Sequence, residues 1–196
     1  MTAARESVST AAVVDTALTL FAERGYHGTA LSQIAEVLQV RTPSLYNHMR
    51  SKHELLETII GDTVRGVLDD FREATANRGD PLDRLYHAVL VYSRRHATHR
   101  REAIVVNRDT SSLDEPTRSQ MQALRREHEH AIRSIIGDGV AAGRFSVDSP
   151  ALASFAIREM CVSIARWYQD GGPITPEQVS REYTEFALSI VGAGRM

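Results

Sequence analysis

Apolar residues recur at spacings of three and four along almost the whole chain, which is the period of amphipathic α-helices. Glycine and proline fall mostly between these segments, where they typically end or begin helices. The sequence contains no convincing strand pattern. The spacing predicts an all-α protein of about nine helices, over about residues 9–24, 31–38, 43–49, 52–75, 81–98, 101–109, 116–142, 150–169 and 176–192.

Capping signals mark the start of several of these helices, and Asp80 followed by Pro81 is one of them, at the fifth helix. Thr42 is a suitable N-cap for the third helix, and Pro43 then takes the first helical position, where its missing N–H costs nothing. Ser51 and Glu54 form the pattern of a capping box, in which the hydroxyl and the carboxylate each accept a hydrogen bond from a free backbone N–H. The fourth helix is therefore expected to begin at Lys52.

The first three helices have the order and lengths of a helix-turn-helix unit. A supporting amphipathic helix precedes two short helices with a tight connection, and in this motif the second short helix enters the major groove of DNA. Leu45 of the third helix is expected to point into the core. Polar groups on or near the exposed face can contact base edges or phosphate oxygens, and they belong to Thr42, Ser44, Tyr46, Asn47 and His48.

The residue types across these helices and their joints form a longer motif. It reads Ala17-x-x-Leu20-Phe21-Ala22-Glu23-Arg24-Gly25-Tyr26-x-Gly28-Thr29, then Ile34-Ala35, Val40, Ser44-Leu45-Tyr46-Asn47-His48-Met49 and Ser51-Lys52-x-x-Leu55-Leu56. This motif closely resembles the N-terminal signature of the TetR family of repressors. It covers about residues 9–56, whereas the rest of the chain resembles the family only in its helical layout.

The resemblance implies a DNA-binding domain over residues 1–52 and an effector-binding and dimerisation domain over residues 53–196. In the family, the residues matching Tyr46 and Lys52 bind phosphates, and the last two helices form the homodimer. A small molecule bound in the larger domain controls DNA binding. We therefore expect a ligand-responsive repressor that binds a palindromic operator in double-stranded DNA as a homodimer.

Lys52 is the only lysine among the 23 lysine and arginine residues of the chain, and it lies in the first turn of a helix whose free N–H groups attract anions. Arg41 flanks the third helix and can add a phosphate contact. Gln39 stands where the family has a turn glycine, so the turn needs either a positive φ or a slightly different geometry. The expected DNA-binding residues are Thr29, Arg41, Thr42, Pro43, Ser44, Tyr46, Asn47, His48 and Lys52.

The fifth, seventh and eighth predicted helices carry polar-tipped or soft side chains where a pocket between helices can form. These candidate ligand contacts are Tyr86, Tyr92, His96, Met121, His128, Met160 and Trp167. Each also suits an ordinary core or surface position, and Trp167 also suits the dimer interface. The segment Arg166-Trp167-Tyr168-x-x-Gly171-Gly172 resembles repressors of the same family that control lipid or acyl-thioester catabolism. We expect a small hydrophobic effector.

Two other functional classes remain open at this point. Glu127 and His130 have the Glu-x-x-His spacing of helical di-iron enzymes, and His96 and His99 also lie one turn apart. A di-iron site needs two such pairs and two further carboxylates, and the sequence has one pair. No Ser/His/Asp, P-loop or dinucleotide motif is present, so we expect no enzyme activity, no cofactor and no metal. A helix-turn-helix adaptor that activates transcription or binds a protein is the third interpretation.

Composition sets the cellular context. The 196-residue chain has a formal net charge of −2, which argues against indiscriminate coating of nucleic acid. Cys161 is the only cysteine, so no intrachain disulfide can form. No apolar run approaches the roughly 20 residues of a membrane span, and Met1 to Thr10 lack the apolar core of a signal peptide. We expect a cytoplasmic protein without a membrane partner.

Overall fold

The computed structural model describes residues 8–193, so most of the N-terminal segment assessed above for a signal peptide lies outside it, as do residues 194–196. Within this range the chain forms nine α-helices and no strand, which confirms the all-α prediction. The helices are α1 (Thr10–Arg24), α2 (Leu31–Val37), α3 (Thr42–Leu45), α4 (Lys52–Thr75), α5 (Pro81–Thr98), α6 (Arg100–Asp109), α7 (Glu115–Ala141), α8 (Pro150–Trp167) and α9 (Pro176–Ile190). A 3₁₀ turn (Thr110–Ser112) follows α6.

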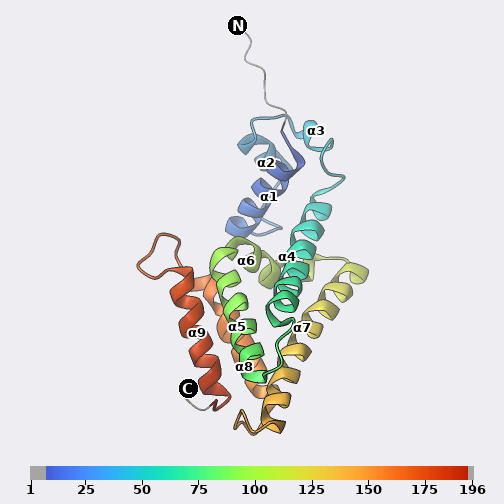
Figure 1. Ribbon diagram of the computed structural model, residues 1–196. Helices are drawn as coiled ribbons and strands as arrows, with labels where there is room; N and C mark the ends of the chain where they lie inside the picture. The colour runs from blue at the N-terminus through green and yellow to red at the C-terminus, as the bar shows by residue number, and fades with distance from the viewer. Residues whose placement is uncertain (1–7, 194–196) are drawn as a thin grey trace.

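The helices form a small head and a larger body (Figure 1). Helices α1 to α3 make the head at one end of the molecule, and α4 runs from the head into the body. There α5, α7, α8 and α9 extend away from the head, while α6 lies where head and body meet. None of the helices in residues 8–193 is both long and apolar enough to cross a membrane.

Two hydrophobic clusters hold this arrangement together. The first contains Phe21 and Leu45 of the head together with Val105 of α6 and Met121 of α7, so it is shared between head and body. The second fills the body between α4, α5, α7, α8 and α9. Burying one large apolar side chain contributes about 1.5–3 kcal/mol. The head is therefore stabilised by the body on which it is packed.

Most helix ends follow the local sequence. Ser9 Oγ accepts a hydrogen bond from Ala12 N at 3.1 Å at the start of α1, and Gly25 ends this helix with a φ of 84°. Asp80 caps α5 in the same way, accepting from Leu82 N at 3.1 Å. Apart from the end of the third helix, every boundary lies within two residues of the expected one.

The third helix is shorter than we expected, because α3 ends at Leu45. Its N-cap residue is Arg41 and not Thr42, and no side chain caps it. Beyond Leu45 the backbone continues as tight turns, in which His48 N donates to Leu45 O at 2.9 Å. Met49, whose N–H donates to Leu45 O at 3.2 Å, is buried in the head cluster and anchors the end of the segment.

The capping box at the start of α4 is only half formed. Ser51 Oγ accepts a hydrogen bond from Glu54 N at 3.1 Å, as the sequence predicts. The Glu54 carboxylate instead accepts from the N–H of Arg50, the residue before the cap. One of the two expected bonds is therefore replaced by a bond to the preceding turn.

The end of α7 depends on a close approach between a glycine and an aromatic ring. Gly139 O accepts hydrogen bonds from Arg144 N at 2.8 Å and Phe145 N at 3.1 Å, which folds the following segment back over the helix. A Cβ atom at Gly139 would lie 2.0 Å from Cδ2 of Phe145, whose side chain is buried. Only glycine fits at this position without moving the ring.

We predict that Gly139→Ala lowers the free energy of unfolding by about 1–3 kcal/mol, because the buried ring must move. Gly137 of the same helix is a matched control, since a Cβ there meets no atom within 4 Å. Gly137→Ala is expected to raise stability by up to about 1 kcal/mol through helix propensity. Chemical denaturation of both variants measures the difference, and equal effects of the two substitutions would contradict the packing at Phe145.

Candidate functional site

The turn between α2 and α3 is closed by backbone bonds in spite of its missing glycine. Gln39 has a φ of 55°, the first of the two geometries that the sequence left open. Val40 N donates to Ala35 O at 2.9 Å across the turn. A left-handed residue other than glycine costs roughly 1–2 kcal/mol. The surrounding packing of the head must offset this cost.

The short segment after this turn presents a polar outer face. Leu45 is fully buried, as predicted, and fixes the orientation of the segment. The side chains that remain outside are those of Arg41, Pro43, Ser44, Tyr46 and Asn47, while Thr42 and His48 are half-buried. Tyr46 is 56% exposed, which is high for an aromatic residue. These seven residues of the expected DNA-binding set therefore lie together on one segment of the head.

Lys52 is bound to the head by contacts within the chain. Its Nζ donates to Tyr26 O at 2.9 Å and to Thr29 O at 2.8 Å, and lies 4.2 Å from the centre of the Tyr26 ring. Partial burial lowers the pKa of the Lys52 ammonium. Lys52 therefore connects the first turn of α4 to the loop between α1 and α2, a role that the sequence motif did not reveal.

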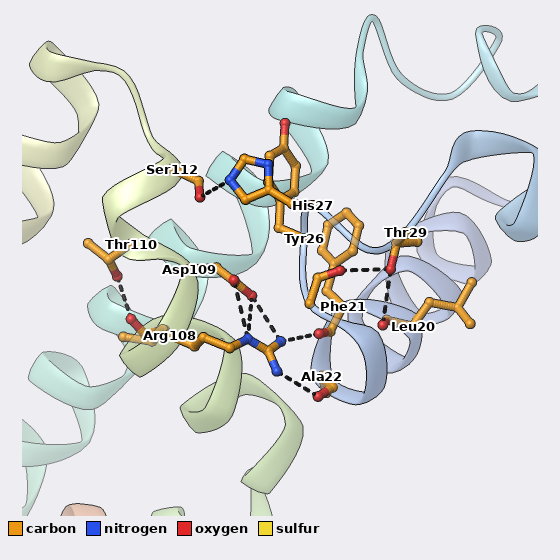
Figure 2. A network of polar contacts seen from close by, with 12 residues as sticks. Leu20, Phe21, Ala22, Tyr26, His27, Thr29, Arg108, Asp109, Thr110 and Ser112 are labelled. Carbon is orange, nitrogen blue, oxygen red and sulfur yellow. Dashed lines mark hydrogen bonds and ion pairs between the residues drawn. The ribbon is translucent and has the colours of Figure 1, made fainter.

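Thr29 is buried, unlike the rest of the expected DNA-binding set. Its hydroxyl donates towards two carbonyls near the end of α1, Leu20 O at 3.1 Å and Gly25 O at 2.9 Å (Figure 2). This hydroxyl offers its one hydrogen to a carbonyl near the end of α1 and to the carbonyl of the residue that follows the helix. The side chain of Thr29 acts within the fold at this position.

Helix α6 holds the head through charged contacts that the sequence analysis missed (Figure 2). The Arg108 guanidinium donates to Phe21 O and, at 3.2 Å, to Ala22 O, both in the last turn of α1. The buried Asp109 carboxylate lies 3.0 Å from the same guanidinium and orients it. A cation at this position also complements the negative end of the helix dipole. No sequence signal distinguished Arg108 from the other surface arginines.

Two further polar contacts extend this junction. Arg101 of α6 forms an ion pair with Asp15 of α1 at 2.9 Å and donates to Thr19 Oγ1 at 2.7 Å. Beyond the end of α6, Ser112 Oγ lies 2.9 Å from Nε2 of His27 (Figure 2). The junction therefore runs from the middle of α1 to the loop that follows it.

A cavity of about 250 Å³ lies in the body between α4, α5, α6, α7 and α8. Among the candidate ligand contacts, Tyr92, His96 and His128 line it. The other four candidates, Tyr86, Met121, Met160 and Trp167, do not. Met121 belongs to the buried cluster beneath the head, and Trp167 is exposed at the end of α8.

The two histidines in the cavity are held uncharged by burial. Burial lowers the pKa of His96 and of His128 to about 4 in each case. His96 Nδ1 lies 2.8 Å from Tyr92 O, which fits a donated hydrogen bond from a neutral imidazole. The His128 ring packs edge-on against Phe71 at 5.1 Å, and its Nε2 has no hydrogen-bond partner among the described residues.

The metal-site alternative has little support from the described residues. Glu127 is paired with Arg72 at 2.7 Å, and His130 is exposed. A different group, His53, Glu57 and Asp114, brings its ligand atoms within 4.8 Å of one another. Both carboxylates in this group already accept hydrogen bonds from Thr117, at 3.1 Å to its hydroxyl and 3.2 Å to its backbone N–H.

Large apolar side chains are exposed along α8 and α9. Leu152 is 72% exposed and Phe155 50% on α8, while Phe186 is 51% exposed on α9. Trp167 stacks on Tyr183 with the ring centres 6.1 Å apart. Apolar surface gathered on two adjacent helices is typical of a protein interaction site.

Comparisons with known proteins give matches over nearly the whole chain. The family model described as bacterial regulatory proteins of the tetR family matches residues 13–59, and that of the tetracyclin repressor-like C-terminal domain matches residues 78–191. The HTH-type transcriptional repressor KstR2 of Mycolicibacterium smegmatis is 28% identical over 175 residues, which cover 88% of this chain and 85% of KstR2.

Solved structures show the same architecture. A bacterial regulatory protein in the tetR family from Rhodococcus RHA1 has a TM-score of 0.86 and 26% sequence identity, covering 98% of this chain and 100% of that one. AibR in complex with isovaleryl coenzyme A and operator DNA has a TM-score of 0.80 at 20% identity, covering 94% of this chain and 99% of AibR. The match to AibR, at 20% identity, shows that the two proteins share a fold.

The buried histidines predict a specific acid sensitivity. Their folded-state pKa of about 4 lies below the roughly 6.5 of an unfolded chain, so the unfolded state binds more protons between these values. The free energy of unfolding that depends on the two uncharged histidines should be fully present above about pH 6.5. It should decline as the pH falls towards 4. In His128→Phe this decline should be smaller by about 1–3 kcal/mol. Urea denaturation across this pH range measures it, and His130→Phe, an exposed position on the same helix, should keep the wild-type decline.

Proposed function

Because this chain belongs to the TetR family of transcriptional regulators, we propose that it is a repressor whose homodimer releases a palindromic operator when a small hydrophobic effector binds. The observation that carries this proposal is the position of α6. Ala103, Val106 and Asn107 of this helix line the cavity, while Arg101 and Arg108 bind the head. One rigid element therefore contacts both the proposed effector site and the DNA-binding unit.

The head binds DNA through the segment that begins at α3. In a helix-turn-helix dimer the two reading segments enter successive major grooves about 34–36 Å apart. The Asn47 amide suits bidentate contacts to an adenine edge, and the Ser44 hydroxyl can reach bases or phosphates. Arg41 and Tyr46, both exposed, contact phosphates on either side.

Lys52 contributes a phosphate contact in addition to its role within the head. An ammonium group has three hydrogens, and two of them are directed to Tyr26 O and Thr29 O. The third remains for a phosphate oxygen at the start of α4, where the free N–H groups of the helix also favour an anion. The internal bonds hold the ammonium in place before DNA arrives.

Effector binding in the cavity changes DNA affinity by moving α6 relative to α1. Shifting the dimer from 99% DNA-competent to 99% incompetent requires a preference of about 5.5 kcal/mol for the second state. A cavity between helices can supply such a preference, because a ligand inside it contacts several helices at once. The last-turn carbonyls of α1 that accept from Arg108 transmit any displacement of α6 directly to the head.

The chemistry of the cavity and one neighbour support the hydrophobic effector. Val64, Val67, Ala103, Val106 and Val162 line the cavity with aliphatic carbon. AibR, which has the same fold, was solved with isovaleryl coenzyme A. These observations agree with the resemblance of the α8 end to regulators of lipid or acyl-thioester catabolism. We therefore place the regulated genes in that area of metabolism.

Mobility shift with DNA from upstream of neighbouring genes tests the proposal, and the wild-type protein is expected to retard such DNA at low salt. Lys52→Ala should weaken binding to every sequence and lower the slope of log K against log salt by about one. Asn47→Ala should instead change the preference among base-substituted operators, by about 1–3 kcal/mol at the affected position.

Arg133→Ala, on the exposed side of α7, serves as the control and should leave both properties unchanged. Circular dichroism confirms that Lys52→Ala remains folded. An unchanged salt slope in a folded Lys52→Ala protein would remove this residue from the interface. If effectors do not release DNA while transcription rises when the protein is bound, the protein is an adaptor or activator and not a repressor.

The homodimer forms through the exposed apolar faces of α8 and α9. Phe186→Arg introduces a charge into this face and should convert a dimer of twice 21.8 kDa into a monomer, with loss of operator affinity. Val37→Arg is the matched control, because Val37 is 59% exposed but lies on α2 in the head. Sedimentation or light scattering gives the masses, and a Phe186→Arg protein that stays dimeric would exclude this interface.

A further inference from the structure

The cavity in the body is rich in positive charge, although the whole chain is slightly acidic. Four arginines line it, Arg95 from α5, Arg125 and Arg126 from α7 and Arg158 from α8, and Glu129 is the only carboxylate among the lining residues. The formal net charge of the full chain is −2. Cationic side chains are therefore concentrated around one cavity, where like charges repel one another.

Two of these arginines are only partly satisfied by the protein. Arg95 Nη1 lies 2.5 Å from Asp70 of α4, and Arg158 Nη2 lies 2.5 Å from the neighbouring Glu159. The Nε atoms of both arginines are buried and have no hydrogen-bond partner in residues 8–193. Unpaired buried N–H groups of charged side chains are costly, so an acceptor placed at these two atoms would be stabilised.

Arg125 and Arg126 have no carboxylate within ion-pair distance among the described residues. Arg125 makes one long contact, from Nη2 to Asn107 Oδ1 at 3.4 Å. Arg126, Asn107 and Gln122 are exposed, which places them at the open side of the cavity. The mouth of the cavity is therefore cationic and accessible.

The inner part of the cavity is different in character. Val64 and Val106 are buried there, together with Tyr92, His96 and His128. Both imidazoles are uncharged at neutral pH, so the positive charge comes from arginine alone. Arginine stays protonated under all physiological conditions. The cavity thus has an uncharged interior, in which aliphatic side chains lie beside a tyrosine and two histidines, and a permanently cationic rim.

We propose that the effector is an amphipathic anion, with its apolar part inside the cavity and its acidic group against Arg125 and Arg126, within reach of Arg158. This inference rests on the proposed function, which makes the cavity the effector site. The acidic group is either the carboxylate of a free acid or a phosphate of a larger acyl conjugate. A volume of about 250 Å³ holds only the apolar part of such a conjugate, whose remainder lies outside the mouth.

Two fluorescent probes that differ by one sulfonate test the proposal on the full-length protein. 8-Anilinonaphthalene-1-sulfonate is anionic, and N-phenyl-1-naphthylamine has the same rings without the charge. In the double variant Arg125→Gln/Arg126→Gln the dissociation constant of the anionic probe should rise at least about tenfold. That of the neutral probe should change by less than about twofold, because the interior is intact.

Two controls separate charge from structure. Arg125→Lys/Arg126→Lys keeps both charges and should retain most of the affinity for the anionic probe. Arg133→Gln removes one exposed arginine of α7 outside the cavity and should change neither probe. If both probes weaken equally in the glutamine variant, if neither changes, or if the wild-type protein does not bind the anionic probe, the proposal is wrong.

Displacement of the anionic probe identifies the source of the acidic group. If a carboxylate suffices, octanoate displaces the anionic probe. If octanoyl coenzyme A displaces the probe and octanoate does not, the phosphates are the acidic group that binds. Displacement by octanamide as strong as that by octanoate would overturn the requirement for charge. Retardation of operator DNA by the ligand-free wild-type protein is measured separately, so failure of the charge proposal leaves the DNA-binding proposal standing.

Discussion

The joining of head and body depends on the apolar cluster that they share, and at its edge the Arg108 guanidinium binds the last carbonyls of α1. Helix ends leave carbonyls without partners, and a cation placed there supplies hydrogen bonds and offsets the helix dipole together. The buried Asp109 carboxylate fixes the guanidinium, and the apolar cluster around Val105 fixes the helix that carries it. A shift of α6 therefore cannot occur without changing the surroundings of α1.

Within the head, stability and the proposed DNA contact involve some of the same groups. Lys52 joins α4 to the loop before α2, Thr29 closes the end of α1, and Gln39 is held in a left-handed conformation by the bonds around it. These contacts hold a four-residue helix that is too short to be stable alone. The polar residues that follow can be presented to DNA because buried neighbours, Leu45 and Met49, anchor both ends of the segment.

The body combines a cavity, a cationic rim and an apolar outer face. Arg158 belongs to α8, and its guanidinium lies 5.2 Å from the ring centre of the exposed Phe155, so cavity and proposed dimer face meet on one helix. A ligand that draws Arg158 towards its anionic group would act on α8 as well as on α6. In the proposed dimer, binding of one effector would therefore change both the spacing of the two heads and the attachment of each head to its body.

The helical periodicity, the caps at Asp80 and Ser51, and the helix-turn-helix motif could be predicted from the sequence by itself, because each depends on neighbours within a few residues. The length of α3 could not be predicted, because the turns that follow Leu45 pack against the head through the buried Met49. The carbonyl partners of Lys52 and Arg108 lie 23 to 87 positions away in the chain, and the arginines around the cavity come from α5, α7 and α8. An arginine on the polar face of a predicted helix gives the same sequence pattern whether that face borders solvent or a cavity. Only the packing of the helices therefore decided which of the 22 arginines and seven candidate ligand contacts meet.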